Sequence, residues 1–433
     1  MRPSTLVVLA VLVLVGSGCS PGAPVTMPSA DPDSITFAKS TTARMAWADE
    51  DAAAAADAIS AFGADLYRSF AADGANLVFS PTSIAVALGM ARVGARGRTA
   101  SEMDEVLYDV ASNAHANWLN SVELSLAERS GTFPDYSGKE ADLKLGEANA
   151  VFAQAGFPIY DAYLDALAAS FGTGLQLVDF AGDPEAARLL INDWVSGETN
   201  ERVPELLPPG IPNDLTRLAL VNAIYLSAPW YAQFDEHETH DGPFTTADGR
   251  TVSVPMMATL QDLPYTNGPA WQAVELPYVG RALAMTIIVP NDLEAFEADL
   301  DGSVLATITG ALSERKVSLL LPRFSAGTHA DLNRPLIDLG MPSAFSEGVA
   351  DFSGITPQSD GFVIQAVVHA AYIDVDERGT EAAASTAVIM GFTSGVEVEV
   401  ALTVDRPFII AVRDTRTGAI LFLGRIADPS VGR

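Results

Sequence analysis

The chain has 433 residues, 48% of them apolar, which is enough to bury a sizeable core in one large domain or two ordinary ones. It carries 55 acidic residues against 25 basic ones, a formal net charge of -30. Such an excess of negative charge repels nucleic acids and anionic membrane surfaces, so neither is an expected partner. The single cysteine, Cys19, excludes an intrachain disulfide.

The first residues have the layout of an export signal. Arg2 precedes an apolar run from Leu6 to Val15, and the small residues Gly16-Ser17-Gly18 lead to Cys19. The run is short for a membrane span. Small residues directly before a cysteine resemble a bacterial lipobox, although Gly16 stands where a larger aliphatic residue is usual. We expect residues 1–19 to be a signal peptide. The exported chain is then either lipid-anchored through Cys19 to the outer face of the cell membrane or released outside the cell.

The composition of the chain changes near residue 57. Residues 20–56 are rich in Pro, Ala, Ser and Asp, which predicts a flexible tether, and residues 57–433 show no linker or repeat, which predicts one domain. Spaced apolar stripes predict helices over residues 52–70, 83–93, 99–107, 114–129, 160–171 and 184–199. Bounded apolar or β-branched runs predict strands over residues 215–226, 271–276, 283–289, 317–321 and 363–376, and a hairpin over 408–412 and 420–423.

Motifs of enzymes and metal sites are weak in this chain. His237 and His240 are three residues apart beside Gly242 and Pro243, whereas a zinc-protease helix needs histidines four apart. A solvated loop is the better interpretation. Clusters of Ser, His and Asp are not apparent, and no glycine-rich phosphate loop follows a strand. We therefore expect a protein that is not an enzyme and needs no metal or cofactor.

Short motifs follow one another in order between residues 57 and 429. They are Asn76–Ile84 (NLVFSPTSI), Ile191–Val195 (INDWV), Val221–Tyr225 (VNAIY), Val274–Tyr278 (VELPY), Leu321–Phe324 (LPRF), Val375–Thr386 (VDERGTEAAAST) and Asp405–Phe408 (DRPF). This series resembles the serpin family of serine protease inhibitors. The resemblance implies an α+β fold with three β-sheets, about nine helices and an exposed reactive-centre loop.

The resemblance also implies a mechanism and a partner. In serpins a protease cuts the loop and forms an acyl-enzyme, and the cut loop inserts into the central sheet and traps the protease covalently. The implied partner is a serine protease, with a cysteine protease as an alternative, and the implied inhibitor is a monomer. By match, a polar "shutter" cluster beneath the sheet comprises Ser80, Ser83, Asn222 and His369. A "breach" group where the loop enters comprises Trp230, Arg323 and Glu377.

The hinge of this loop has residues suited to insertion. Its members are Glu377, Gly379, Thr380, Glu381, Ala382, Ala383, Ala384, Ser385 and Thr386. In a strand, one alternate set of side chains would run from Thr380 to Met390 without a charge, and the other has only Glu381, near the entrance. No proline interrupts residues 380–404, so each residue can join a sheet ladder. This pattern predicts an inhibitor; the alternative is a serpin-fold binding protein that does not inhibit.

The bond offered to the protease is predicted by the usual loop length of the family. Counting from Gly379 gives Thr393, followed by Ser394, and Phe392 is the alternative one position earlier. Thr393 suits the small pocket of elastase-like enzymes, and Phe392 suits chymotrypsin- or subtilisin-like pockets. Because neither Lys nor Arg lies between Gly379 and Arg406, a trypsin-like target is not expected.

Overall fold

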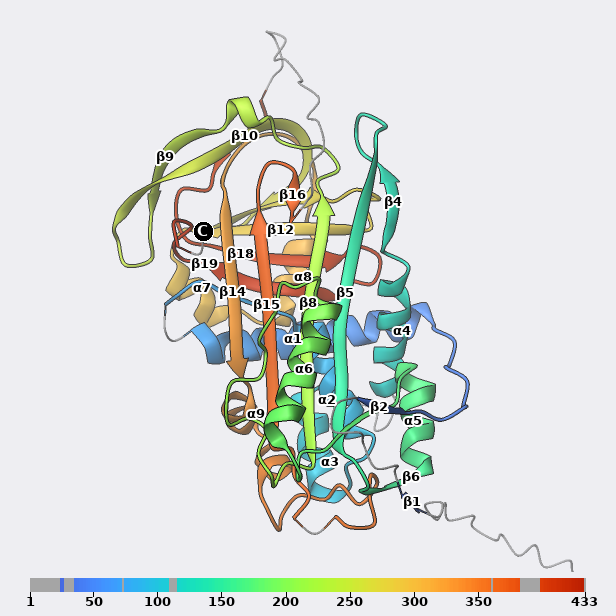
Figure 1. Ribbon diagram of the computed structural model, residues 1–433. Coiled ribbons are helices and arrows are strands. Elements are labelled where there is room, and N and C mark those ends of the chain that lie inside the picture. Colours follow the sequence, from blue (N-terminus) through green and yellow to red (C-terminus); the bar gives the residue numbers. More distant parts are fainter. Residues whose placement is uncertain are drawn as a thin grey trace, which may run out of the picture.

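The computed structural model describes residues 24–26, 35–71, 74–108, 115–359, 361–381 and 398–431. Within these ranges the chain forms nine α-helices around two large β-sheets (Figure 1). The helices are α1 (Asp49–Phe70), α2 (Pro81–Arg92), α3 (Gly97–Val106), α4 (His115–Ala127), α5 (Asp161–Phe171), α6 (Pro184–Glu198), α7 (Leu293–Asp299), α8 (Gly302–Gly310) and α9 (Asn333–Leu339). In the described ranges no helix is long and apolar enough to cross a bilayer.

The first large sheet has eight strands and runs along the length of the molecule (Figure 1). Its order is β14 (Phe324–Asp331), β15 (Ala366–Val375), β16 (Gly379–Thr380), β8 (Leu218–Pro229), β5 (Glu140–Gln154), β7 (Leu175–Val178) and β2 (Thr36–Ala38), with β4 (Gly131–Pro134) beside β5. We call it the central sheet.

The second large sheet has nine strands and passes behind the central sheet. Its order is β17 (Val400–Thr403), β13 (Ser313–Pro322), β10 (Thr251–Asn267), β11 (Trp271–Pro277), β12 (Leu283–Pro290), β18 (Phe408–Asp414), β19 (Ile420–Ile426) and β3 (Leu77–Phe79), with β9 (His240–Thr245) beside β10. The long strand β10 pairs with β9 and β13 and, at its end, with β11. The resemblance implied three sheets. Two of them are joined here into this nine-stranded sheet, because both contain β10. A separate pair joins β1 (Pro24–Thr26) to β6 (Pro158–Tyr160).

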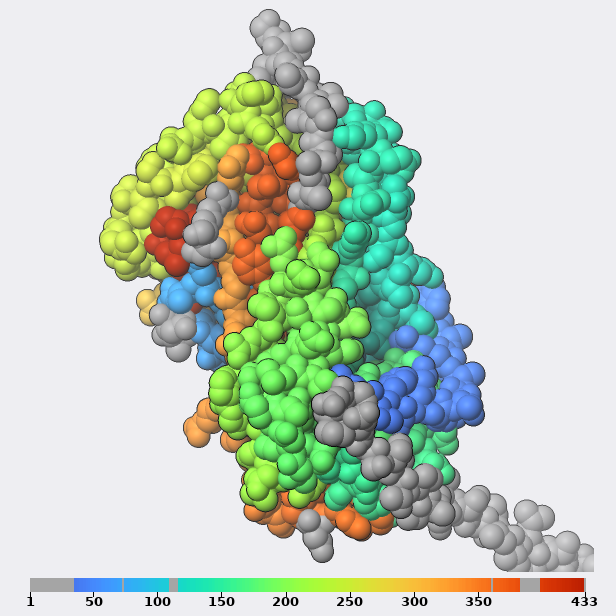
Figure 2. Space-filling view, viewed as in Figure 1, coloured from blue at the N-terminus to red at the C-terminus, as the bar shows by residue number. Residues whose placement is uncertain are grey.

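Apolar side chains cover both faces of the central sheet. The main core lies between this sheet, the second sheet, and helices α1 and α2. A smaller core lies on the other face, where Ile191 and Val195 of α6 pack with Phe152 and Val221 of the sheet. Helix α6 lies across this face, and the upper part of the sheet emerges above it (Figure 2). Strand β8 is therefore almost wholly buried, which explains its continuous apolar sequence.

Local sequence signals set the ends of the helices that support the sheet. Ser80 caps α2 by accepting a hydrogen bond from the Ser83 N–H at 3.2 Å, and Pro81 occupies the first turn. Asp183 caps α6 in the same way, before Pro184. These caps set the first residues of α2, which packs beneath β8, and of α6, which packs on the opposite face of the sheet.

The prediction of a flexible tether over residues 20–56 is wrong for its second half. Thr36–Ala38 adds a strand to β7 at the edge of the central sheet, and α1 begins at Asp49. Between them, Arg44 donates to Asn120 Oδ1 at 2.8 Å and to Glu123 Oε2 at 2.9 Å on α4. Composition concealed this order because the segment depends on long-range partners. We call residues 35–48 the N-terminal strap.

The strap supplies the cation beside two partly buried carboxylates, Glu123 and Glu147. Burial, with a smaller contribution from Glu147, raises the pKa of Glu123 to about 8 against the opposing effect of Arg44. Burial likewise raises the pKa of Glu147 to about 7. A carboxyl whose folded-state pKa is raised favours the folded state at low pH, and this stabilisation is lost as pH rises through the raised value.

We predict that thermal stability falls as pH rises from about 5 to about 8, and that Glu123→Gln makes this fall smaller. The amide cannot ionise, so the variant loses the part of the pH dependence that comes from Glu123, on the order of 1 kcal/mol or more. Melting temperatures of both proteins across this range test the prediction. Glu128→Gln, an exposed change just beyond α4, is the control and should follow the wild type. An unchanged slope in Glu123→Gln would contradict the prediction.

Candidate functional site

The middle of the central sheet holds a parallel junction between β8 and β15. Their register runs from Ala219 opposite Ala366 to Ile224 opposite Ala371. Beyond this point the two strands part, and the short strand β16 lies between their upper ends. The sheet is therefore closed at the junction and already divided above it (Figure 1).

A polar cluster lies beneath the junction and links it to α2. His369 on β15 accepts a hydrogen bond from the Ser80 N–H at its Nε2 atom, at 3.1 Å, and its Nδ1 atom contacts Oδ1 of Asn222 on β8. Asn222 in turn donates to Asn149 on β5. Because Nε2 accepts, the proton of a neutral ring lies on Nδ1 and is donated to Asn222.

The ring of His369 stays neutral over the physiological range. Burial, with a smaller contribution from His329, lowers its pKa to about 3. The four residues expected in the shutter cluster are thus neighbours, with Ser83 joined through Ser80. The sequence analysis missed Asn149, although an amide in the otherwise apolar run of residues 148–153 is a signal for a buried partner.

The start of the hinge is seated inside the sheet. Thr380 is fully buried and pairs with Val375 on β15 and with Ala228 on β8. Gly379 precedes it with a φ of 153°, and a Cβ atom there would lie 2.2 Å from the Ala228 carbonyl oxygen. Only glycine fits this position. The remaining hinge residues, Ala382 to Thr386, lie outside the described residues, as do Phe392, Thr393, Ser394 and Cys19.

An aromatic pair connects the seated hinge to the top of the second sheet. The rings of Trp230 and Tyr278 stack with centroids 4.6 Å apart. The Tyr278 hydroxyl is 2.7 Å from Thr380 Oγ1, and the Trp230 indole N–H donates to the Asp376 carbonyl at 2.9 Å. Trp230 was expected here, whereas Tyr278 was part of a matched motif without an assigned place. The pair holds both ends of the turn that leads into β16.

Arg323 and Glu377, the other two breach residues, form an ion pair that closes this turn. Arg323 Nη2 lies 2.6 Å from Glu377 Oε1, and the Thr239 hydroxyl donates to the same oxygen. The Glu377 side chain is only 3% exposed, compared with 31% for Arg323. A surface pair contributes little to stability, but a buried carboxylate without its cation is costly. The pair therefore secures the turn.

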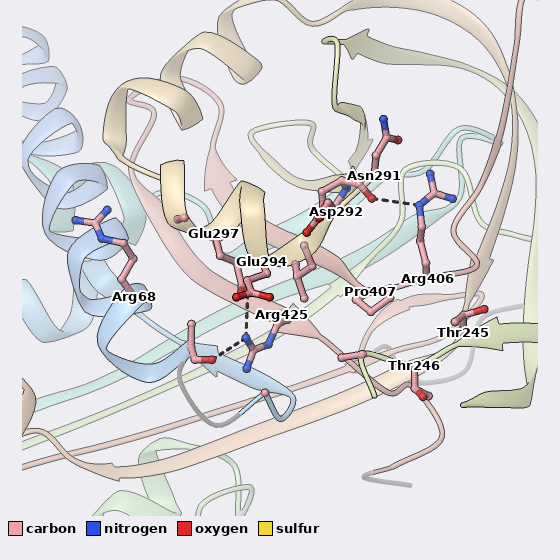
Figure 3. A pocket seen from close by; sticks show the side chains of 16 residues that line it. Arg68, Thr245, Thr246, Asn291, Asp292, Glu294, Glu297, Arg406, Pro407 and Arg425 are labelled. Atoms are coloured by element: carbon pink, nitrogen blue, oxygen red, sulfur yellow. Dashed lines mark hydrogen bonds and ion pairs between the residues drawn. The ribbon is translucent and has the colours of Figure 1, made fainter. Parts of the chain in front are cut away.

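Two other features, a histidine pair and a cavity, are candidate binding sites. His237 and His240 are exposed, and the described residues contain no group of three side chains able to hold a metal. A cavity of about 840 Å³ lies beside α7, lined by Arg68, Arg406 and Arg425 among others (Figure 3). Arg425 is bound to Glu297 at 3.0 Å, and Arg406 donates to the Pro290 carbonyl at 3.1 Å. These cations already have protein partners, so the cavity is a weak candidate for an anion site.

We predict that Arg323→Met lowers the free energy of unfolding by roughly 2 kcal/mol, because it leaves the buried Glu377 without its cation. Urea denaturation followed by circular dichroism measures this change. Arg378→Met removes a neighbouring, more exposed pair with Glu236 and should change stability by no more than about 0.5 kcal/mol. Equal losses of unfolding free energy in the two variants would show that the Arg323–Glu377 pair stabilises the protein no more than the exposed Arg378–Glu236 pair does.

Comparisons with known proteins agree with this geometry. The family described as Serpin (serine protease inhibitor) matches residues 57–429. An uncharacterized serpin-like protein of Thermococcus kodakarensis is 35% identical, with the whole of both chains covered. Leukocyte elastase inhibitor A of Mus musculus is 34% identical over 82% of this chain and 93% of its own. The native structure of the thermophilic serpin tengpin is 23% identical and shares the fold, with a TM-score of 0.78 over 91% of this chain and 99% of its own. The chain belongs to the serpin family.

Proposed function

We propose that this serpin inhibits a serine protease by loop cleavage, acyl-enzyme trapping and insertion of the cut loop into the central sheet. The observation that carries the proposal is the seat of Thr380, which pairs with β15 on one side and β8 on the other. The first residue of the uncharged set is thus already in the ladder that a new strand would extend. Small residues 382–385 follow, and no proline interrupts the chain as far as Val404.

Insertion has a definite energetic requirement. A strand that continues from β16 has to separate β8 from β15 and exchange the bonds of His369 and Asn222 beneath them. In return, the inserted strand gains ladder hydrogen bonds to both neighbouring strands, and every second residue buries its side chain. An uncharged alternate set makes this gain available without a buried unpaired ion.

The target class follows from the loop residues. Thr393, with Phe392 as the alternative, favours an elastase-, chymotrypsin- or subtilisin-like protease, and the similarity to a leukocyte elastase inhibitor supports the first. Because residues 1–19 have the layout of an export signal, the target that we propose is a protease outside the cell or at the outer face of its membrane. A serpin-fold binding protein that does not trap proteases is the alternative function.

We predict that one of elastase, chymotrypsin and subtilisin forms a complex that survives SDS, because the acyl bond is retained when the protease is distorted. Gel electrophoresis after mixing measures this band, and mass spectrometry of the released peptide locates the cut at Thr393 or Phe392. Trypsin is the control and should give no complex. Cleavage without any stable complex by all of these enzymes would contradict inhibition of these classes.

We also predict that Thr380→Arg converts the inhibitor into a substrate, because a charge would have to enter the buried ladder position. The ratio of trapped to cleaved protein measures this, and Thr380→Ser, which keeps the hydroxyl for Tyr278, should still trap.

The same variants separate the two candidate functions. After cleavage of the loop, the wild type should melt far above the intact protein, since the new strand completes the sheet. Cleaved Thr380→Arg should show a much smaller rise. If cleavage barely changes the melting temperature of the wild type, the loop does not insert, and the binding-protein alternative is favoured.

A further inference from the structure

Glu381 stands at the point where the seated hinge leaves the ladder. Its N–H donates to the Asp374 carbonyl at 2.9 Å, and its carbonyl accepts from Ser227 Oγ at 3.0 Å, so the residue is bonded to both flanking strands. Its φ is nevertheless 48°, in the left-handed region that residues with a side chain seldom adopt. A strand cannot continue with this value. Any deeper insertion has to change the φ of Glu381 first.

The side chain of Glu381 is buried in an unusual way for a carboxylate. It is 2% exposed, and neither oxygen accepts a hydrogen bond from a described residue. The nearest cation is Arg202, whose Nε lies 3.2 Å from Oε2 and whose side chain is 49% exposed. Arg202 belongs to the segment that follows α6, so the contact joins the hinge to the element that covers the sheet.

The ionisable groups around Glu381 come from two elements. Arg202 follows α6, while Asp374 and Tyr372 lie on β15. Burial raises the pKa of Glu381 to about 7; Arg202 opposes the rise and Asp374 adds to it. Below this value the carboxyl is neutral and its burial costs little. Above it the side chain is an ion with one half-exposed partner.

We propose that Glu381 and Arg202 are positioning residues for loop insertion, which hold the hinge at the depth of Thr380 and release this hold as the solution becomes alkaline. The inference rests on the proposed function and concerns its regulation. A withdrawn hinge exposes Glu381 to water, where the carboxyl regains its ordinary pKa. The seated state is therefore favoured at acidic pH, and its share falls as pH rises from about 4.5 to about 7.

The experiment uses the intact protein without a protease, so it does not depend on inhibition. Trp230 is the reporter, because its ring stacks on Tyr278, whose hydroxyl contacts the seated Thr380. Its fluorescence between about pH 4 and pH 9 should follow a single transition that is complete by about pH 7. A Trp230→Phe protein, which lacks the reporter, should lose this transition and so assign the signal.

Variants of the two residues test the proposal directly. Glu381→Gln should remove the transition and keep the acidic-form signal at every pH. Arg202→Gln should enlarge the transition, because the ionised carboxylate of the seated state loses its cation and the hinge is released more completely at alkaline pH, and Arg202→Lys should restore the wild-type amplitude. Glu147→Gln is the matched control: it removes another carboxyl whose pKa lies near 7, and the transition should remain.

The outcomes are distinct. No transition in the wild type, a transition that persists in Glu381→Gln, or an unchanged or smaller transition in Arg202→Gln would each overturn the proposal. Because Arg202 is half exposed, its variants keep the test valid even if Glu381→Gln does not fold. A normal transition in a protein that traps no protease would retain the hinge mechanism and reject the proposed function alone.

Discussion

The parallel ladder between β8 and β15 holds together two strands that, in the proposed mechanism, have to separate. Its hydrogen bonds are supported from below by the buried cluster of His369 and Asn222, which joins both strands to the cap of α2. Above the ladder the strands are already apart and the hinge occupies the space. The large core on one face and α6 on the other depend on this junction, because both pack against strands that it fixes.

Much of the fold could be predicted from the sequence, because its elements carry local signals. The strongly apolar β8, the capped helices α2 and α6, and the C-terminal hairpin lie within a few residues of their predicted positions. The strands β5 and β10 were missed. Their exposed and half-buried residues mix with buried ones, so neither shows a clean alternation, and their pairing is decided by distant partners.

The candidate site was predictable by motif but not by energetics. The shutter residues lie together and the breach residues lie together, and Glu377 is buried, although a sequence cannot distinguish a surface pair from a covered one. The sequence placed Glu381 near the entrance of the sheet, where its charge was not expected to be buried, yet its side chain is only 2% exposed. That burial arises from the left-handed turn of its backbone and from the position of Arg202, and neither has a local sequence signal.

Strand β17 gives the loop a second attachment, and this has a mechanical consequence. Residues 400–403 are bonded to β13 in the second sheet, while Thr380 is bonded in the central sheet. An uncut chain between them has a fixed reach of at most about 3.4 Å per residue. It can feed only a limited length into the central sheet before it pulls on β17. In the proposed mechanism the β13–β17 ladder therefore limits insertion of the uncut loop, and cutting the loop removes this limit.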